Sequence, residues 1–246
     1  MSNPLTWLAW GACLALGCGG GGTPACFDGP TIDLDMRAQT TLPWNSPRPV
    51  VGAEICVQAP MDCGCEPVDD TGFATLSLPP NSEVTTLTQA DGYVPNLGLV
   101  ATGTRDFSLA VRLSRTDEFD FVFTSLGLTM DPAAGHVGVG LLPATGGDAS
   151  GFTVALTSLA DGTTIAPTYF VARVPDASAP ATDTDGLAFF LNVPPGRYEV
   201  TSDGLSGCGA VETGLPRRDG AGALRAIEVE VRAGMISAVS AVSCGI

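Results

Sequence analysis

The sequence lacks lysine altogether, and all 11 of its basic residues are arginine. Against 26 aspartate and glutamate residues this leaves a formal net charge of −15. A polyanion would be repelled by that charge, so we exclude nucleic acid as a partner. A phosphate-binding P-loop is excluded as well, because it requires a lysine after its glycine-rich turn and Gly19 to Gly22 has none.

Histidine is nearly absent too, since His136 is the only one. This excludes zinc motifs built on histidine pairs and leaves a single imidazole to serve a serine or cysteine nucleophile. Because His136 lies near the expected start of a second module, we expect it at the surface or at a strand edge. The sequence Gly204 to Cys208 resembles a nucleophile elbow but ends in cysteine where that motif needs glycine. A small hydrolase that uses His136 is therefore the least favoured of our functional hypotheses, and we expect no catalytic residues.

The composition predicts an all-β protein. It is 45% hydrophobic, with 31 glycines and 19 prolines, which is too apolar for disorder and too rich in turn formers for a helical bundle. Alternating apolar residues indicate strands, and Asp-Gly turns separate them. One segment has helical spacing instead, with Thr116 as its N-cap and Gly127 at its end, although Phe119, Phe121 and Phe123 also fit a strand. The alternating strand positions are Ile32, Leu34 and Met36; Phe107, Leu109, Val111 and Leu113; and Ile227, Val229 and Val231.

A short apolar run at residues 5–16 has the length of a secretory signal and is too short to span a bilayer. It ends in Leu-Ala-Leu-Gly before Cys18 and resembles a bacterial lipoprotein signal with its lipobox. The resemblance implies that residues 1–17 are removed, that Cys18 carries the lipid, and that residues 18–25 form a glycine-rich tether. Gly19, in place of aspartate, implies an outer membrane lipoprotein facing the periplasm or the cell surface. The alternative is an ordinary secretory signal with Cys18 as a plain cysteine.

Six cysteines remain once Cys13 leaves with the signal and Cys18 is lipidated, which predicts three disulfides in an oxidising compartment. We expect Cys208 to pair with Cys244. The pairing among the other four stays open. Zinc held by Cys63 and Cys65 together with Cys56 and Cys26 is the alternative, but structural zinc sites favour two to four residues between paired cysteines, so no metal is expected. The four early cysteines are Cys26, Cys56, Cys63 and Cys65.

An internal repeat divides the mature chain into two modules, 26–130 and 131–246. The segments 70–74 and 78–84 are echoed by 184–188 and 193–200, about 115 residues later. Each copy contains a turn, a strand, a Pro-Pro pair that lacks N–H groups, and a second strand. We interpret each copy as a hairpin.

The second copy carries Asp185-Gly186, Val193-Pro-Pro-Gly196 and Tyr198-Glu-Val200 and resembles the carboxypeptidase regulatory-like, prealbumin-like β-sandwich family. The resemblance implies two tandem prealbumin-like or Ig-like sandwiches without chemistry of their own. The segment with helical spacing would then form a short helix near the joint between them. We therefore expect a lipid-anchored envelope protein that acts as a binding, adhesion or scaffold module, without a cofactor. The expected partners are the membrane and either a glycan or an envelope protein.

Two further site hypotheses stay open. A carbohydrate-binding role would need exposed aromatic rings, for which the candidates are Trp44, Tyr93 and Tyr169. Calcium could be held by either of two acidic groups, although neither follows a known loop spacing. The two groups are Asp176, Asp183 and Asp185, and Asp117, Glu118 and Asp120.

Overall fold

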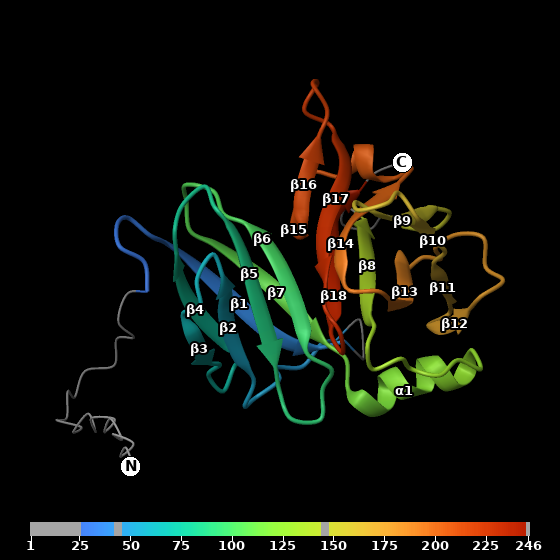
Figure 1. Cartoon of the computed structure of the whole chain (residues 1–246), viewed down its shortest axis with the longest axis horizontal. Helices are drawn as coiled ribbons and strands as arrows, with labels where there is room; N and C mark the ends of the chain where they lie inside the picture. The colour runs from blue at the N-terminus through green and yellow to red at the C-terminus, as the bar shows by residue number, and fades with distance from the viewer. Residues whose placement is uncertain (1–25, 42–45, 144–147, 245–246) are drawn as a thin grey trace, which may run out of the picture.

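The computed structural model describes residues 26–41, 46–143 and 148–244, and this part of the chain is built mainly of β-strands (Figure 1). The predicted signal, the tether with Cys18, and Trp44 lie outside the described residues. Within the described ranges, no helix has the length and apolar character needed to cross a membrane.

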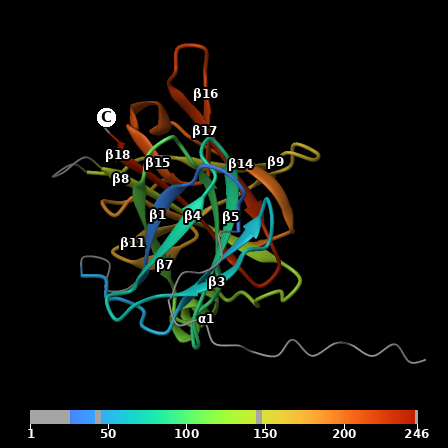
Figure 2. The same cartoon turned by 90° about the vertical axis from the view of Figure 1, so that its left-hand side faces the viewer.

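The first sandwich consists of the seven strands that precede the helix. A three-stranded sheet in the order β4-β1-β7 packs against strands in the order β3-β2-β5-β6 (Figure 2). The predicted alternation is confirmed in β1, where Ile32, Leu34 and Met36 are buried while Asp33 and Asp35 are exposed. The strands are β1 (Ile32–Thr40), β2 (Glu54–Ala59), β3 (Gly64–Pro67), β4 (Phe73–Leu78), β5 (Glu83–Gln89), β6 (Asn96–Ala101) and β7 (Phe107–Leu113).

The second sandwich contains the remaining strands. A five-stranded sheet in the order β10-β9-β14-β17-β16 packs against strands in the order β12-β11-β13-β8-β18, and β15 also pairs with β18. The strands are β8 (Gly135–Pro143), β9 (Val154–Ser158), β10 (Thr164–Ile165), β11 (Thr168–Val171), β12 (Val174–Asp176), β13 (Leu187–Val193), β14 (Gly196–Ser202), β15 (Ala210–Thr213), β16 (Leu215–Arg218), β17 (Leu224–Val231) and β18 (Ile236–Cys244), with a 3-10 turn at Leu205–Gly207. The all-β double sandwich predicted from the sequence is thus confirmed.

One sheet continues from the first sandwich into the second. Strand β18 pairs in parallel with β8 and, at Ile236 and Ser237, also in parallel with β6. The sheet of the first sandwich that contains β6 and the sheet of the second that contains β8 are therefore parts of a single ten-stranded sheet, which we call the shared sheet. Strand β18 lies at the centre of the molecule (Figure 1).

The repeated Pro-Pro segments are not hairpins, so that interpretation was wrong. Strands β4 and β5 belong to different sheets, and so do β13 and β14. Each Pro-Pro pair instead lies where the chain crosses from one sheet of its sandwich to the other, and neither proline can donate a backbone N–H to a neighbouring strand. In the first copy the crossing includes Asn81, whose φ of 51° is left-handed.

Two disulfides hold the Cys-rich region of the first sandwich, as predicted. Cys26 bonds to Cys63, and Cys56 bonds to Cys65 across the β2–β3 pair. Cys208 also forms a disulfide. The side chain of Cys244 lies outside the described residues, so its pairing with Cys208 stays a prediction.

The predicted helix exists as α1 (Thr116–Ser125), which follows β7 directly. Its N-cap is Arg115, not Thr116, and the backbone N–H of Arg115 donates to Glu118 Oε2 at 3.4 Å. Phe119 and Phe123 point inward and are buried, whereas Phe121 is 59% exposed. The helix therefore covers the outer face of the shared sheet with one aromatic side and leaves one ring at the surface.

Candidate functional site

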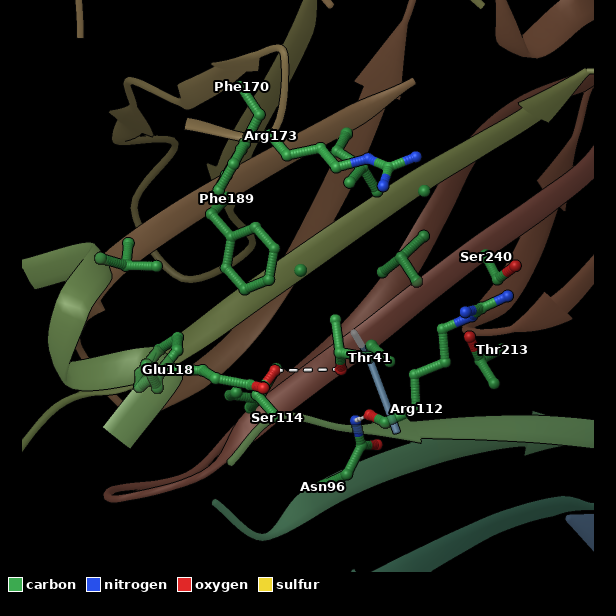
Figure 3. A pocket seen from close by; sticks show the side chains of 18 of the residues that line it. Thr41, Asn96, Arg112, Ser114, Glu118, Phe170, Arg173, Phe189, Thr213 and Ser240 are labelled. Carbon is green, nitrogen blue, oxygen red and sulfur yellow. Dashed lines mark hydrogen bonds between the residues drawn. The ribbon is translucent and has the colours of Figure 1, made fainter. Parts of the chain in front are cut away.

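A cavity of about 570 Å³ lies between α1, β7 and the outer face of the shared sheet (Figure 3). Its volume is within the range of about 300–1,000 Å³ typical of small-molecule sites. The second sandwich supplies the floor, while the first sandwich and the helix supply the walls.

The floor is deep because the outward residues of two central strands are small. Alternate residues of a strand face opposite sides of a sheet. On β8, Val137, Val139 and Leu141 fill the core of the second sandwich, which turns the intervening glycines toward the cavity. On β18, Val239 and Ala241 do the same. The small residues of the floor are Gly138, Gly140, Ala238 and Ser240.

One end of the cavity is apolar. It is lined by Phe119, Phe121 and Val122 of α1 and by Phe170 and Phe189 of the sheet, although the carboxylates of Asp117 and Glu118 also line the cavity from this helix. The rings of Phe170 and Phe189 lie 5.4 Å apart between centroids. This end can bury an aliphatic or aromatic group.

The other end is polar. Arg112, Thr213 and Ser240 gather there in Figure 3, and Ser240 Oγ hydrogen-bonds Glu212 Oε2 at 3.1 Å. Burial lowers the pKa of Arg112, and the nearby charge of Glu212 opposes that shift. Thr213 is only 3% exposed, and its Oγ1 has no hydrogen-bond partner among the described residues.

A strained turn places Arg173 at the rim. The β11–β12 turn has left-handed φ values at both Ala172 (49°) and Arg173 (70°), although asparagine and glycine are the usual residues in such turns. Arg173 Nε pairs with Asp185 Oδ2 at 3.2 Å. The ion pair fixes this side chain beside Phe170.

His136 is not at the surface or at a strand edge, so that expectation was wrong. It is 1% exposed, lies on the central strand β8, and contacts Phe119 and Phe123 edge to face. Its Nδ1 accepts a hydrogen bond from the Asn192 backbone at 3.2 Å, and burial lowers its pKa to about 4. Helix α1 covers the ring, a contact that the local sequence does not indicate.

The acidic groups considered for calcium serve local loops. Asp176 Oδ1 accepts from the backbone and hydroxyl of Ser178, and Asp183 Oδ2 accepts from the Ala172 backbone. Asp117 pairs with Arg115 at 3.0 Å. Within the described ranges, no three histidine, cysteine or acidic side chains are grouped to hold a metal ion.

The two described candidates for glycan stacking, Tyr93 and Tyr169, do not form an exposed platform. Tyr169 is 5% exposed and belongs to the core of the second sandwich, where its hydroxyl accepts from the Val154 backbone at 2.9 Å. Tyr93 is half-buried against the core of the first sandwich. Tyr169 is therefore unavailable for stacking on a sugar.

Of the residues that line the cavity, only Asp117 and Glu118 belong to a predicted site, the acidic group considered for calcium. The available signal was the alternation of small residues in Gly138-Val-Gly140 and Ala238-Val-Ser240, where the intervening valines mark the buried face. That pattern shows which face of each strand carries only small side chains. It does not show that α1 and β7 enclose the space above it.

No protein-family model matches the chain, and no curated protein matches it in sequence. Among solved structures, it is similar to the minor pilin of Streptococcus agalactiae, with 10% identity, coverage of 87% of this chain and 97% of the pilin, and a TM-score of 0.28. The major pilin subunit of Bacillus cereus gives 10% identity, 86% and 99% coverage, and a TM-score of 0.28.

The TIE protein of Bacillus anthracis gives 13% identity, coverage of 86% of this chain, and a TM-score of 0.26. The matched part is 34% of that protein, so this chain spans about a third of its length. At such TM-scores these likenesses carry no argument about function. The sandwich fold is established by the strands and sheets themselves.

Proposed function

We propose that this chain is an exported, lipid-anchored and non-catalytic binding protein of the cell envelope, with the cavity between α1, β7 and the shared sheet as its binding site. The cavity itself carries the proposal. It combines an apolar wall with a few polar groups, which is the usual make-up of a ligand site. Its lining includes no histidine or cysteine, so it does not resemble a nucleophile with its base.

The anchor is supported by the order of residues around Cys18, and acylation tests it. Labelled palmitate should enter the wild-type protein and the Cys13→Ser variant but not Cys18→Ser. Cys13→Ser is the matched control because it removes the other cysteine of the N-terminal segment. Equal labelling of all three proteins would refute the anchor. Outer membrane sorting predicts that the labelled protein fractionates with that membrane, and protease treatment of intact cells would separate a surface location from a periplasmic one.

The binding site is tested by filling the cavity. A side chain at position 140 would enter it without backbone strain, because φ of Gly140 is not left-handed and an added Cβ meets Leu187 at an ordinary 3.9 Å. Gly140→Leu should abolish saturable binding of the neutral dye Nile red. Gly220→Leu, in a loop with nothing within 4 Å of the added Cβ, should bind like wild type. Equal binding by all three proteins would show that the cavity is not the binding site.

A further inference from the structure

The polar end of the cavity contains a buried hydroxyl that is left without a protein partner. Thr213 lies where β15 and β6 both meet β18, and it pairs with Ser240 in the β15–β18 register. Most buried polar side-chain atoms have a hydrogen-bond partner, because burying one unpaired is unfavourable. Oγ1 itself is enclosed in the ligand-free chain. Rotation of the side chain about its Cα–Cβ bond would turn Oγ1 toward the cavity, where a ligand atom would satisfy it.

Because Thr213 lies at the polar end of the cavity, we propose that the cavity holds an elongated, neutral molecule with an apolar body and one hydroxyl or carbonyl group at its end. The apolar body would lie along Gly138 and Gly140 toward α1, and the polar end would hydrogen-bond Thr213 Oγ1. The inference rests on the proposed binding function and adds the chemical class of the ligand.

The charges that line the cavity favour a neutral molecule. At the polar end, Arg112 lies within the field of Glu212, so the cation already has a counter-charge. A ligand carboxylate would meet Glu212 there, and near α1 it would meet Asp117 and Glu118. An ammonium group would meet Arg112 instead. A hydroxyl or carbonyl adds no charge to a poorly solvated space, where an unpaired ion is costly.

The length of the cavity supports an elongated shape. Phe121 and Val122 line it at the helix, while Thr213 and Glu212 line it beyond β18. Between them the floor consists of small residues on β8 and β18. A linear chain can lie over that floor with one end against aromatic rings and the other at the hydroxyl.

The test compares three competitors that share one chain length. Octan-1-ol, octanoate at pH 8 and octylammonium at pH 7 are titrated against bound Nile red, and each inhibition constant is corrected with the dye affinity of the same variant. We expect octan-1-ol to bind at least tenfold more tightly than either ion. Octanoate or octylammonium competing as well as the alcohol would overturn the neutral class.

Variants of Thr213 separate a hydrogen bond from simple partitioning into an apolar space. Thr213→Val keeps the shape and removes the hydroxyl, so it should weaken octan-1-ol about fivefold, the equivalent of one net hydrogen bond. Thr213→Ser keeps a hydroxyl and should retain affinity, as should the exposed Thr104→Val control. If Thr213→Val bound the alcohol like wild type, the assignment of the polar end would be wrong.

The two proposals fail in different ways. If Gly140→Leu leaves Nile red binding intact, the cavity is not the site and the binding function falls with it. If Gly140→Leu blocks the dye but the alcohol shows no preference and no dependence on Thr213, the site stands and only the ligand class is refuted.

Discussion

Acidification should destabilise this protein through its one histidine. The folded protein protonates His136 only near its lowered pKa of about 4, whereas the unfolded chain does so near 6.5. Between these values the unfolded state holds more protons, so stability is full above pH 6.5 and falls as the pH drops toward 4. Linkage with these two pKa values gives a loss of about 2 kcal/mol between pH 7.5 and pH 5.

Urea unfolding at a series of pH values measures this loss. The control is His136→Asn, whose side-chain oxygen can still accept the Asn192 N–H. This variant is less stable throughout because it loses ring packing, but it should lack the loss assigned to the imidazole. The net charge of −15 also changes with pH, and its effect cancels when the two proteins are compared. Parallel curves for wild type and variant between pH 5 and pH 7.5 would refute the reasoning.

The same histidine can be observed directly. Because it is the only imidazole in the chain, its proton resonances need no assignment in an untagged protein. They should titrate near pH 4 in the folded state and near 6.5 in urea. A folded-state midpoint near 6.5 would show that α1 does not cover the ring.

Three further predictions concern stability. Replacing Cys26 and Cys63 together with alanine should lower the free energy of unfolding by about 4 kcal/mol, and replacing Cys56 and Cys65 by about 3 kcal/mol, because the first bond spans 37 residues and the second 9. Urea unfolding that reversed this order would contradict the loop argument. Reduction of the wild type should add the mass of six hydrogens if Cys208 pairs with Cys244. Glu228→Gln should cost about 1–2 kcal/mol because Glu228 is nearly buried between Arg197 and Arg217, whereas Glu199→Gln, which loses only the exposed Arg225, should change thermal stability little; equal losses would argue against the buried pair. Thr213→Val should stabilise the ligand-free protein by about 1 kcal/mol by removing an unpaired buried hydroxyl, and a lower melting temperature would show that this hydroxyl is satisfied.

The sequence predicted the features that depend on neighbouring residues. Alternation identified β1, β7 and β17, and helical spacing identified α1, because each pattern shows within a single element which residues face the core. The Pro-Pro segments were misread because a chain that turns within one sheet and a chain that crosses between two sheets use the same turn residues. Only the partners of β4 and β5 distinguish the two.

Features that join distant segments could not be predicted. The β6–β18 pairing brings Asn96 beside Ile236, and neither strand carries a local mark of it. His136 shows the same limit, since its burial depends on a helix contributed by the segment before β8. The cavity likewise needs β7, α1 and the shared sheet together, so the sequence shows its lining residues only as positions of separate strands and of one helix.

The central position of β18 imposes an order on folding during synthesis. All strands of the first sandwich are made before β18, so the part of the β6 edge that pairs with Ile236 and Ser237 stays open until these residues are made. Strand β8 likewise lacks its neighbour at one edge until β18 is made. An open edge can pair with other chains. An emerging polypeptide therefore exposes two such edges until β18 is made and pairs with both strands.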